Sequence, residues 1–248
     1  MNAPVTVSEL TKKFYDEGRG EIIAVNAISF ECQEGEVFGL LGANGAGKTT
    51  TLRMLSTVIA PTSGYAAILG HDVVKDSEKA RMNLGFYSAS TALYPRLTAR
   101  ETITFFAEIN QYPPHLVSNR VNAIMERFGI AKFADARVDR LSSGMKQKVS
   151  IARTIAHDPR IVIFDEPTVG LDVISSLEVQ ESIRQLRNEG KTIIFSTHIM
   201  SEAERLCDRL AIVHRGRILA NGTLDSLRRA TGHHYLEDIF VSYIRDCE

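Results

Sequence analysis

Four short runs of apolar residues recur along the chain, each bounded by polar or glycine-containing segments: VFGLL (37–41), IVIFD (161–165), TIIFST (192–197) and LAIVH (210–214). Runs of this length without alternation are typical of parallel-sheet strands that are covered on both faces. Residues 3–10, 22–31 and 65–70 alternate only partly between apolar and polar positions and predict further short strands, separated by turns such as DEGRG. The uninterrupted runs therefore predict the interior of a parallel sheet.

Helical patterns alternate with these strands. One is expected to follow the glycine-rich segment GANGAGK and to run through TTLRMLSTVI (50–59). A second, SSLEVQESIRQLRNEG, ends at Gly190, a residue type that often caps helices. A third, SEAERLCDR, is expected to begin at Ser201, with Glu204 at capping-box spacing. Alternating strands and helices predict an α/β fold.

Residues from about 96 to 150 depart from that alternation. TARETITFFAEI opens with Thr98 and Glu101 at capping-box spacing, and HLVSNRVNAIMERFG and the stretch after LSSG also have helical patterns. We therefore expect a mainly helical insertion between the first part of the sheet and the strand at 161–165.

The composition is that of an ordinary globular protein, with 44% apolar and 24% charged residues among 248. A net charge of −1 gives no reason to expect a polyanionic partner such as DNA. Cys32, Cys207 and Cys247 are far apart and odd in number, which disfavours disulfides and a zinc site and indicates a reducing compartment. Because no apolar run approaches the roughly 20 residues that cross a bilayer, we expect a cytoplasmic protein whose membrane role comes through a partner.

The segment GANGAGKTT carries the strongest signal for chemistry. It follows the strand VFGLL and precedes a helix, the context that the pattern G-x-x-x-x-G-K-[ST] requires for phosphate binding. Glycines let successive backbone N–H groups face an anion, and the helix N-terminus adds partial positive charge. Lys48 is expected to reach the β- and γ-phosphates and the Thr49 hydroxyl to ligate Mg²⁺. The expected phosphate-binding residues are Gly42, Ala43, Asn44, Gly45, Ala46, Gly47, Lys48, Thr49 and Thr50.

Two carboxylates stand at the end of the run IVIFDEP. An apolar strand that ends in a carboxylate delivers Asp165 to the C-terminal edge of a parallel sheet, where ligands bind. Asp165 is expected to hold Mg²⁺ directly or through water, and Glu166 to orient and deprotonate an attacking water. A simple turn at the strand end is the alternative, and the pairing with the phosphate loop favours catalysis.

The segment LSSGMKQ (141–147), followed by DEPTVGLD and STH behind GANGAGKTT, resembles the ATP-binding cassette (ABC) ATPases over nearly the whole chain. The resemblance implies that LSSGM is the signature motif, which in this family caps the γ-phosphate of an ATP held by a second cassette packed head to tail. Ser142 offers a hydroxyl, Gly144 permits close approach, and a helix start follows. Ser142, Ser143 and Gly144 are thus expected to bind ATP across a dimer, with a plain helix cap as the alternative.

Three more residues have roles that the resemblance implies. His198, in STH, matches the switch histidine that contacts the γ-phosphate and positions the water, although a lone histidine can equally end a strand. Asp172, in VGLD, matches the D-loop aspartate at the dimer interface. Phe14 matches the aromatic residue that stacks on adenine, with Tyr15 as the alternative and a core or surface position as the rival interpretation.

The chain departs from the family pattern in three motifs. Ala89 stands where the family usually has a glutamine that touches Mg²⁺ and senses the membrane partner, which puts coupling through that loop in doubt. Ser143 and Met145 replace the usual glycine and glutamine of the signature, and Val169 replaces the usual D-loop serine. The signature still has the hydroxyl and the glycine nearest the phosphate, so ATP binding by this motif is still expected.

The resemblance implies an α/β P-loop NTPase with a central, mainly parallel sheet, an N-terminal antiparallel β subdomain and an inserted helical subdomain. The expected division is about 1–95 and 151–220 for the nucleotide-binding core with the β subdomain, about 96–150 for the helical subdomain and about 221–248 for a C-terminal helical tail.

The resemblance also implies an ATPase that uses ATP and Mg²⁺, with Glu166, His198 and Lys48 as catalytic residues. Its expected partners are a transmembrane permease, which holds it at the inner face of the cell membrane, and a second cassette, either a copy or a paralogue. HIMSEAERLCDRLAIVHRGRILANGT resembles transporter cassettes, and LEDIF resembles the exporter-type group that includes sodium and drug efflux systems. No nucleic acid and no metal other than Mg²⁺ are expected.

Two other classes of protein remain for comparison. A soluble ABC ATPase with a mechanical or regulatory role is the main alternative to a transporter subunit. A small-molecule kinase or GTPase shares the phosphate loop but has no use for LSSGMKQ or STH.

Overall fold

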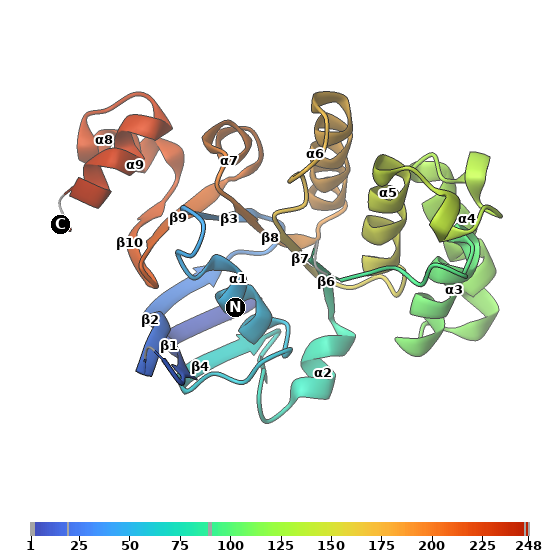
Figure 1. Ribbon diagram of the computed structural model, residues 1–248, viewed down its shortest axis with the longest axis horizontal. Helices are drawn as coiled ribbons and strands as arrows, with labels where there is room; N and C mark the ends of the chain where they lie inside the picture. Colours follow the sequence, from blue (N-terminus) through green and yellow to red (C-terminus); the bar gives the residue numbers. More distant parts are fainter. Residues whose placement is uncertain (1–2, 19, 89–90, 246, 248) are drawn as a thin grey trace.

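The computed structural model describes residues 3–18, 20–88, 91–245 and 247, and its centre is a six-stranded sheet (Figure 1). The strand order is β10-β9-β3-β8-β7-β6, and only the pair β9–β10 is antiparallel. The predicted α/β fold with a mainly parallel sheet is therefore confirmed. The strands are β3 (Val37–Leu41), β6 (Leu84–Ser88), β7 (Ile161–Asp165), β8 (Thr192–Thr197), β9 (Arg209–His214) and β10 (Arg217–Gly222).

A second, antiparallel sheet with the order β2-β1-β4-β5 is built mainly from the N-terminal part of the chain. The three partly alternating segments are strands as predicted, but the first two are longer, because β1 and β2 continue into a hairpin as far as Asp16 and Gly20. Register shifts along β1 and positive φ angles at Glu9 (48°) and Ala27 (50°) break the alternation that would have revealed this length. The strands are β1 (Val5–Asp16), β2 (Gly20–Cys32), β4 (Ser63–Ile68) and β5 (His71–Asp72).

Three helices, α1 (Lys48–Leu55), α6 (Val173–Asn188) and α7 (Met200–Leu206), lie against the central sheet (Figure 1). The expected extension of α1 to residue 59 is wrong, because Thr57 has a φ of 60° and turns the chain away. The expected capping box at Ser201 is also wrong, because α7 begins one residue earlier and has no side-chain cap. Gly190 follows α6 with a φ of 84°, which confirms the glycine stop.

The segment between β6 and β7 forms the predicted helical insertion, which lies beyond one end of the central sheet in Figure 1. Thr98 and the Glu101 side chain make the predicted capping box at its first helix. Figure 1 shows two C-terminal helices at the opposite end of the molecule, and α2 beside the N-terminal sheet. The remaining helices are α2 (Ser77–Met82), α3 (Ala99–Ile109), α4 (Val117–Arg127), α5 (Ser143–Thr154), α8 (Leu224–Thr231) and α9 (Leu236–Arg245), with single 3-10 turns at Pro114–Leu116, Ala131–Phe133 and Val138–Arg140.

The central strands contribute side chains to two different hydrophobic cores. Phe164 and Phe195 pack with the helical insertion and α6, whereas Ile163 and Ile194 pack with α1 and the N-terminal sheet. The uninterrupted apolar runs are thus explained, because neighbouring residues on one strand face opposite cores and both cores exclude water. In the part of the chain that the structure describes, no helix combines the length and the apolar character that a membrane crossing demands.

Candidate nucleotide site

The loop between β3 and α1 wraps tightly at the C-terminal edge of the sheet. Gly45 and Gly47 have φ angles of 78° and 106°, and a Cβ added at Gly47 would lie 2.6 Å from the carbonyl oxygen of Ala24. Only glycine satisfies both the backbone angle and the close approach. No side chain caps α1, so the first turn of that helix presents its N–H groups toward the loop. This geometry suits an anion.

Lys48 lies under the loop and is only 4% exposed. Its Nζ donates hydrogen bonds to the carbonyl oxygens of Gly42 (2.8 Å) and Ala43 (3.1 Å), and lies 3.2 Å from Oε1 of Glu166. The ammonium is therefore held between the phosphate loop and the end of β7. A buried cation in this position adds positive charge to a loop that already presents N–H groups.

Asp165 is the last residue of β7, and one of its carboxylate oxygens accepts hydrogen bonds from two hydroxyl groups. Thr49 Oγ1 donates to Oδ1 at 3.0 Å and Ser196 Oγ at 2.8 Å. Burial raises the pKa of the Asp165 carboxyl, and the two hydrogen bonds from Ser196 and Thr49 oppose that rise. The Asp165 carboxylate and the Thr49 hydroxyl together offer two hard oxygen ligands. This pair fits Mg²⁺, which usually keeps water or phosphate oxygens as its other ligands.

Glu166 lies one residue beyond the strand in a backbone conformation that is uncommon for a side-chain-bearing residue, with a φ of 48°. Its N–H donates to the carbonyl oxygen (3.2 Å) and the hydroxyl (3.1 Å) of Ser196. Its Oε1 lies 3.3 Å from Nδ1 of His198 as well as near Lys48. Glu166 also lines a cavity of about 190 Å³ together with Ala24 and residues 44–50 of the phosphate loop. The carboxylate is thus placed where a phosphate-bound reactant would meet it.

The second expected phosphate site, the signature, has a different environment. Ser142 is exposed at the start of α5, and its Oγ accepts a hydrogen bond from the N–H of Met145 at 3.3 Å. Ser143 is also exposed, and none of Ser142, Ser143 and Gly144 lines the phosphate-loop cavity. Figure 1 shows α5 within the helical insertion and α1 under the middle of the sheet. One chain therefore does not bring its two phosphate-binding helix starts together.

A family model described as ABC transporter matches residues 25–169, which is more than half of the chain. The chain belongs to the ABC transporter family. It is 39% identical over 239 residues to the ABC transporter ATP-binding protein NatA of Bacillus subtilis, covering 96% of this chain and 97% of that protein. It is 36% identical over 247 residues to the probable multidrug ABC transporter ATP-binding protein YbhF of Escherichia coli, covering 98% of this chain but 42% of that protein.

Solved structures show the same fold. One, described as the ATP-binding subunit of an ABC transporter, is 29% identical with a TM-score of 0.87, over 97% of this chain and 99% of that one. Another is a dimeric ATP-binding cassette in a post-hydrolysis state with ADP and phosphate, 26% identical with a TM-score of 0.79, over 88% of this chain and 98% of that one. The chain is therefore an ABC ATPase that binds ATP, and the predicted P-loop NTPase fold is confirmed.

Asp172, the expected D-loop aspartate, caps the N-terminus of α6 in its own chain. Asp172 Oδ1 accepts hydrogen bonds from the N–H groups of Ile174 and Ser175, both at 3.0 Å, and Oδ2 accepts one from the Ser175 hydroxyl at 2.7 Å. These bonds, led by the one from the Ser175 hydroxyl, lower the pKa of the Asp172 carboxyl. The side chain is exposed at the N-terminus of α6, so the cap leaves it open to a second chain.

The aromatic candidates for adenine lie on β1. Phe14 is 43% exposed and has Lys12 Nζ 5.1 Å from its ring centroid, whereas Tyr15 is 82% exposed. Phe14 pairs with Ile22 of β2, the strand that carries Ala24 of the phosphate-loop cavity, but does not itself line that cavity. Ala89, the departure from the family glutamine, lies outside the described residues. The stacking role of Phe14 stays a prediction.

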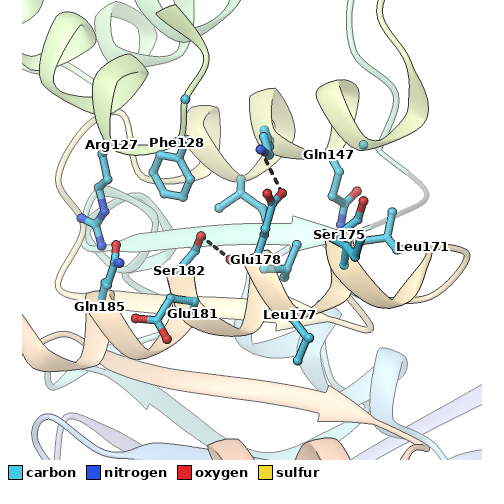
Figure 2. Close-up of a pocket in the computed structure, with 16 residues that line it drawn as sticks. Arg127, Phe128, Gln147, Leu171, Ser175, Leu177, Glu178, Glu181, Ser182 and Gln185 are labelled. Carbon is cyan, nitrogen blue, oxygen red and sulfur yellow. Dashed lines mark hydrogen bonds and ion pairs between the residues drawn. The ribbon is translucent and has the colours of Figure 1, made fainter.

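A larger cavity of about 500 Å³ lies between α5 and α6 (Figure 2). Figure 2 shows Phe128 above one end of it and Leu171 at the other, with Leu177 and Glu178 on α6. Lys148 and Glu178 form an ion pair of 2.9 Å across the groove. Gly144 is part of this lining, so the signature helix borders two environments, the groove on one side and solvent on the other.

Two residues of the site region were not assigned a role from the sequence. Ser196 forms hydrogen bonds with both Asp165 and Glu166. It lies opposite Asp165 where β7 pairs with β8, so a prediction of the strand order could have placed the two residues together. Gln147 accepts a hydrogen bond from Tyr87 at 2.7 Å and donates one to the carbonyl oxygen of Pro167. It thus joins the signature helix to the turn after Glu166.

Proposed function

We propose that the chain is the ATP-hydrolysing subunit of an ABC exporter, and that it works only when two cassettes pack head to tail around ATP. One observation carries the proposal. The phosphate loop, Asp165 and Glu166 form one connected site, whereas the signature at Ser142 is exposed and lies apart from it. A site that has phosphate-binding residues on two separate surfaces is complete only when another chain supplies the second surface.

On the phosphate-loop side, the N–H groups of residues 42–50 would bind the phosphates and Lys48 would contact the β- and γ-phosphates. Thr49 and Asp165 would hold Mg²⁺, which supplies charge neutralisation for the phosphates when bound. Glu166 would orient the attacking water and accept its proton, because its carboxylate lines the cavity. His198 would contact the γ-phosphate from the end of β8, where it already lies 3.3 Å from Glu166.

The second chain would contribute its signature. The hydroxyls of Ser142 and Ser143, the close backbone approach at Gly144 and the positive end of α5 would bind the γ-phosphate from the opposite side. Asp172 would contact the partner across the dimer, and Phe14 would stack on the adenine. The dimeric state of the solved cassette with ADP and phosphate supports this arrangement.

The most direct experiment mixes two inactive variants. Lys48→Ala removes the phosphate-loop cation, and Gly144→Asp places a bulky anion at the signature. In a mixed dimer, the phosphate loop of the Gly144→Asp chain meets the intact signature of the Lys48→Ala chain. One good site forms, so the 1:1 mixture should recover about a quarter of the wild-type ATPase rate, because half of the dimers carry one of two sites.

The matched control mixes the Gly144→Asp chain with a Lys48→Ala/Gly144→Asp double variant, which leaves every site defective and should stay inactive. Subunit exchange is verified by differently tagged chains. If the first mixture shows only the summed rates of its two components despite exchange, the composite site is refuted.

For the cellular role we propose a separate permease that holds this ATPase at the inner face of the membrane. The support is the naming of relatives as transporter subunits, including a probable multidrug transporter protein. A non-transport ABC ATPase is the alternative. Pull-down of the tagged chain from detergent-solubilised membranes should recover a multi-span protein, and recovery of ribosomal or DNA-repair proteins in its place would favour the alternative.

A further inference from the structure

A buried carboxylate without a cation lies beside the loop that carries His198. Glu202, in the first turn of α7, is 4% exposed, and within residues 3–18, 20–88, 91–245 and 247 no lysine, arginine or histidine pairs with it. Its Oε2 accepts a hydrogen bond from Thr197 Oγ1 at 2.8 Å, and its Oε1 accepts one from Ser176 Oγ at 3.4 Å. Burying a polar side chain is costly unless it is hydrogen-bonded, so these two hydroxyls stabilise Glu202 in its buried position.

The hydrogen bonds form a directed chain between two elements of the site. The Ile199 N–H donates to Thr197 Oγ1 at 3.0 Å, and Thr197 donates in turn to Glu202. From the other side, Gln180 Nε2 donates to Ser176 Oγ at 3.2 Å, and Ser176 donates to Glu202. The two hydroxyls therefore donate to different oxygens of the Glu202 side chain, and each hydroxyl also accepts a hydrogen bond from another residue.

The two ends of this series of hydrogen bonds lie in different parts of the fold. Thr197 and Ile199 flank His198, so their bonds fix the backbone from which the imidazole reaches Glu166. Ser176 lies one turn after Asp172 on α6. The face of α6 toward the groove in Figure 2 carries Ser175, Leu177 and Glu178, whereas Ser176 does not line that groove and bonds to α7.

We propose that Glu202 is a positioning residue for ATP hydrolysis, which holds the loop that carries His198 in a fixed position relative to α6. The inference rests on the proposed roles of His198 and Glu166. When α6 is engaged through Asp172 by a second chain, Glu202 transmits the position of α6 to the histidine loop. The phosphate-loop contacts, which supply most of the binding to ATP, do not depend on these hydrogen bonds, so Glu202 affects turnover much more than ATP affinity.

The test compares Glu202→Gln with Glu204→Gln in the full-length protein. Glu204 is an exposed carboxylate on the same helix, so it controls for loss of charge. The amide that Glu202→Gln introduces keeps the shape of the side chain but presents N–H groups to one of the two hydroxyls. We expect kcat to fall about 10- to 100-fold, the effect of a hydrogen bond to a charged group, while the Kd for ATP stays within about twofold. Glu204→Gln should match the wild type.

Thr197 supplies a second, independent measurement. Thr197→Ser keeps the hydroxyl and should retain activity, whereas Thr197→Val should lose turnover as Glu202→Gln does. The double variant Glu202→Gln/Thr197→Val should be no slower than the worse single variant, because both substitutions break the same series of hydrogen bonds. A normal kcat in folded Glu202→Gln, or additive losses in the double variant, would overturn the positioning role.

The proposed site roles are tested separately by His198→Ala and Glu166→Gln. If these two variants hydrolyse ATP normally, the proposed function of the site fails. If they are inactive while Glu202→Gln and Thr197→Val keep full turnover with unchanged unfolding temperatures, only the positioning role of Glu202 fails.

Discussion

The two helix starts that we propose to bind phosphate differ in how many contacts each makes within one chain. At the phosphate loop, Lys48 and Asp165 are 4% and 5% exposed, and each is bonded to neighbouring elements. At the signature, Ser142 is exposed, and among the described residues its hydroxyl bonds only to the first turn of its own helix. The first site is preorganised by the fold, whereas the second is an exposed helix start whose nearest anchor is Gln147, which bonds to Tyr87 and to the carbonyl oxygen of Pro167.

Further contacts hold the C-terminal end of α5 and the residues just after it. Arg153 donates to the carbonyl oxygens of Thr91 (2.8 Å) and Ala92 (3.1 Å), and His157 lies 3.2 Å from the carbonyl oxygen of Leu84 in β6. The signature helix is therefore fixed to the sheet at its end and presents its positively polarised start to solvent. Within one chain, Asp165 and Glu166 are thus held in place by several contacts, whereas the start of the signature helix is open to a second chain, as the proposed dimer requires.

The largest expected effect is at the preorganised site. Glu166→Gln keeps the shape of the side chain but removes the proton acceptor, so turnover should fall about 10²- to 10⁴-fold while ATP remains bound. Phosphate release measures the loss, and size-exclusion chromatography with Mg-ATP should show a persistent dimer. Glu178→Gln, which alters only the groove ion pair with Lys148, is the matched control. A monomer at every ATP concentration would contradict the comparison.

The next largest expected effect is on stability, and it concerns His157, which lies just after the C-terminal end of the signature helix α5. Burial lowers the pKa of His157 from 6.5 to about 4. Between these values the unfolded chain binds a proton that the folded chain does not, so stability falls as pH falls. At pH 5 the loss from this group is at most about 2 kcal/mol relative to pH 7.

Urea unfolding of the wild type and of His157→Gln at both pH values measures this contribution. The variant should show a smaller drop, and the exposed His233→Gln should show the wild-type drop. An equal change in the free energy of unfolding with pH in all three proteins would contradict the lowered pKa of His157.

The smallest effect is at the exposed start. Ser142→Ala removes a helix cap and should lower the free energy of unfolding by about 1 kcal/mol. Thr223→Ala removes the equivalent cap of α8, far from the site, and should cost about as much. Only Ser142→Ala should also weaken the ATP-dependent dimer, as measured by chromatography. Equal dimerisation of the two variants would show that the signature hydroxyl is only a cap.

The sequence predicted the parts of this molecule that depend on local pattern. Central strands were predictable because continuous burial on both faces leaves an uninterrupted apolar run, as at 161–165. The ends of β1 and α1 were not, because bulges and the left-handed Thr57 follow from tertiary fit and leave no local signal. The bonds from Ser196 to Asp165 and from Ser176 to Glu202 were also hidden, since they join residues 31 and 26 positions apart.

The stacked rings of Phe30 in β2 and Phe38 in β3, 5.0 Å apart between centroids, join the N-terminal sheet to the central one. Both belong to the same core as Leu52 of α1. Because the two sheets share this core, we expect them to unfold together, and we expect a truncation that deletes the first hairpin to disrupt the phosphate loop.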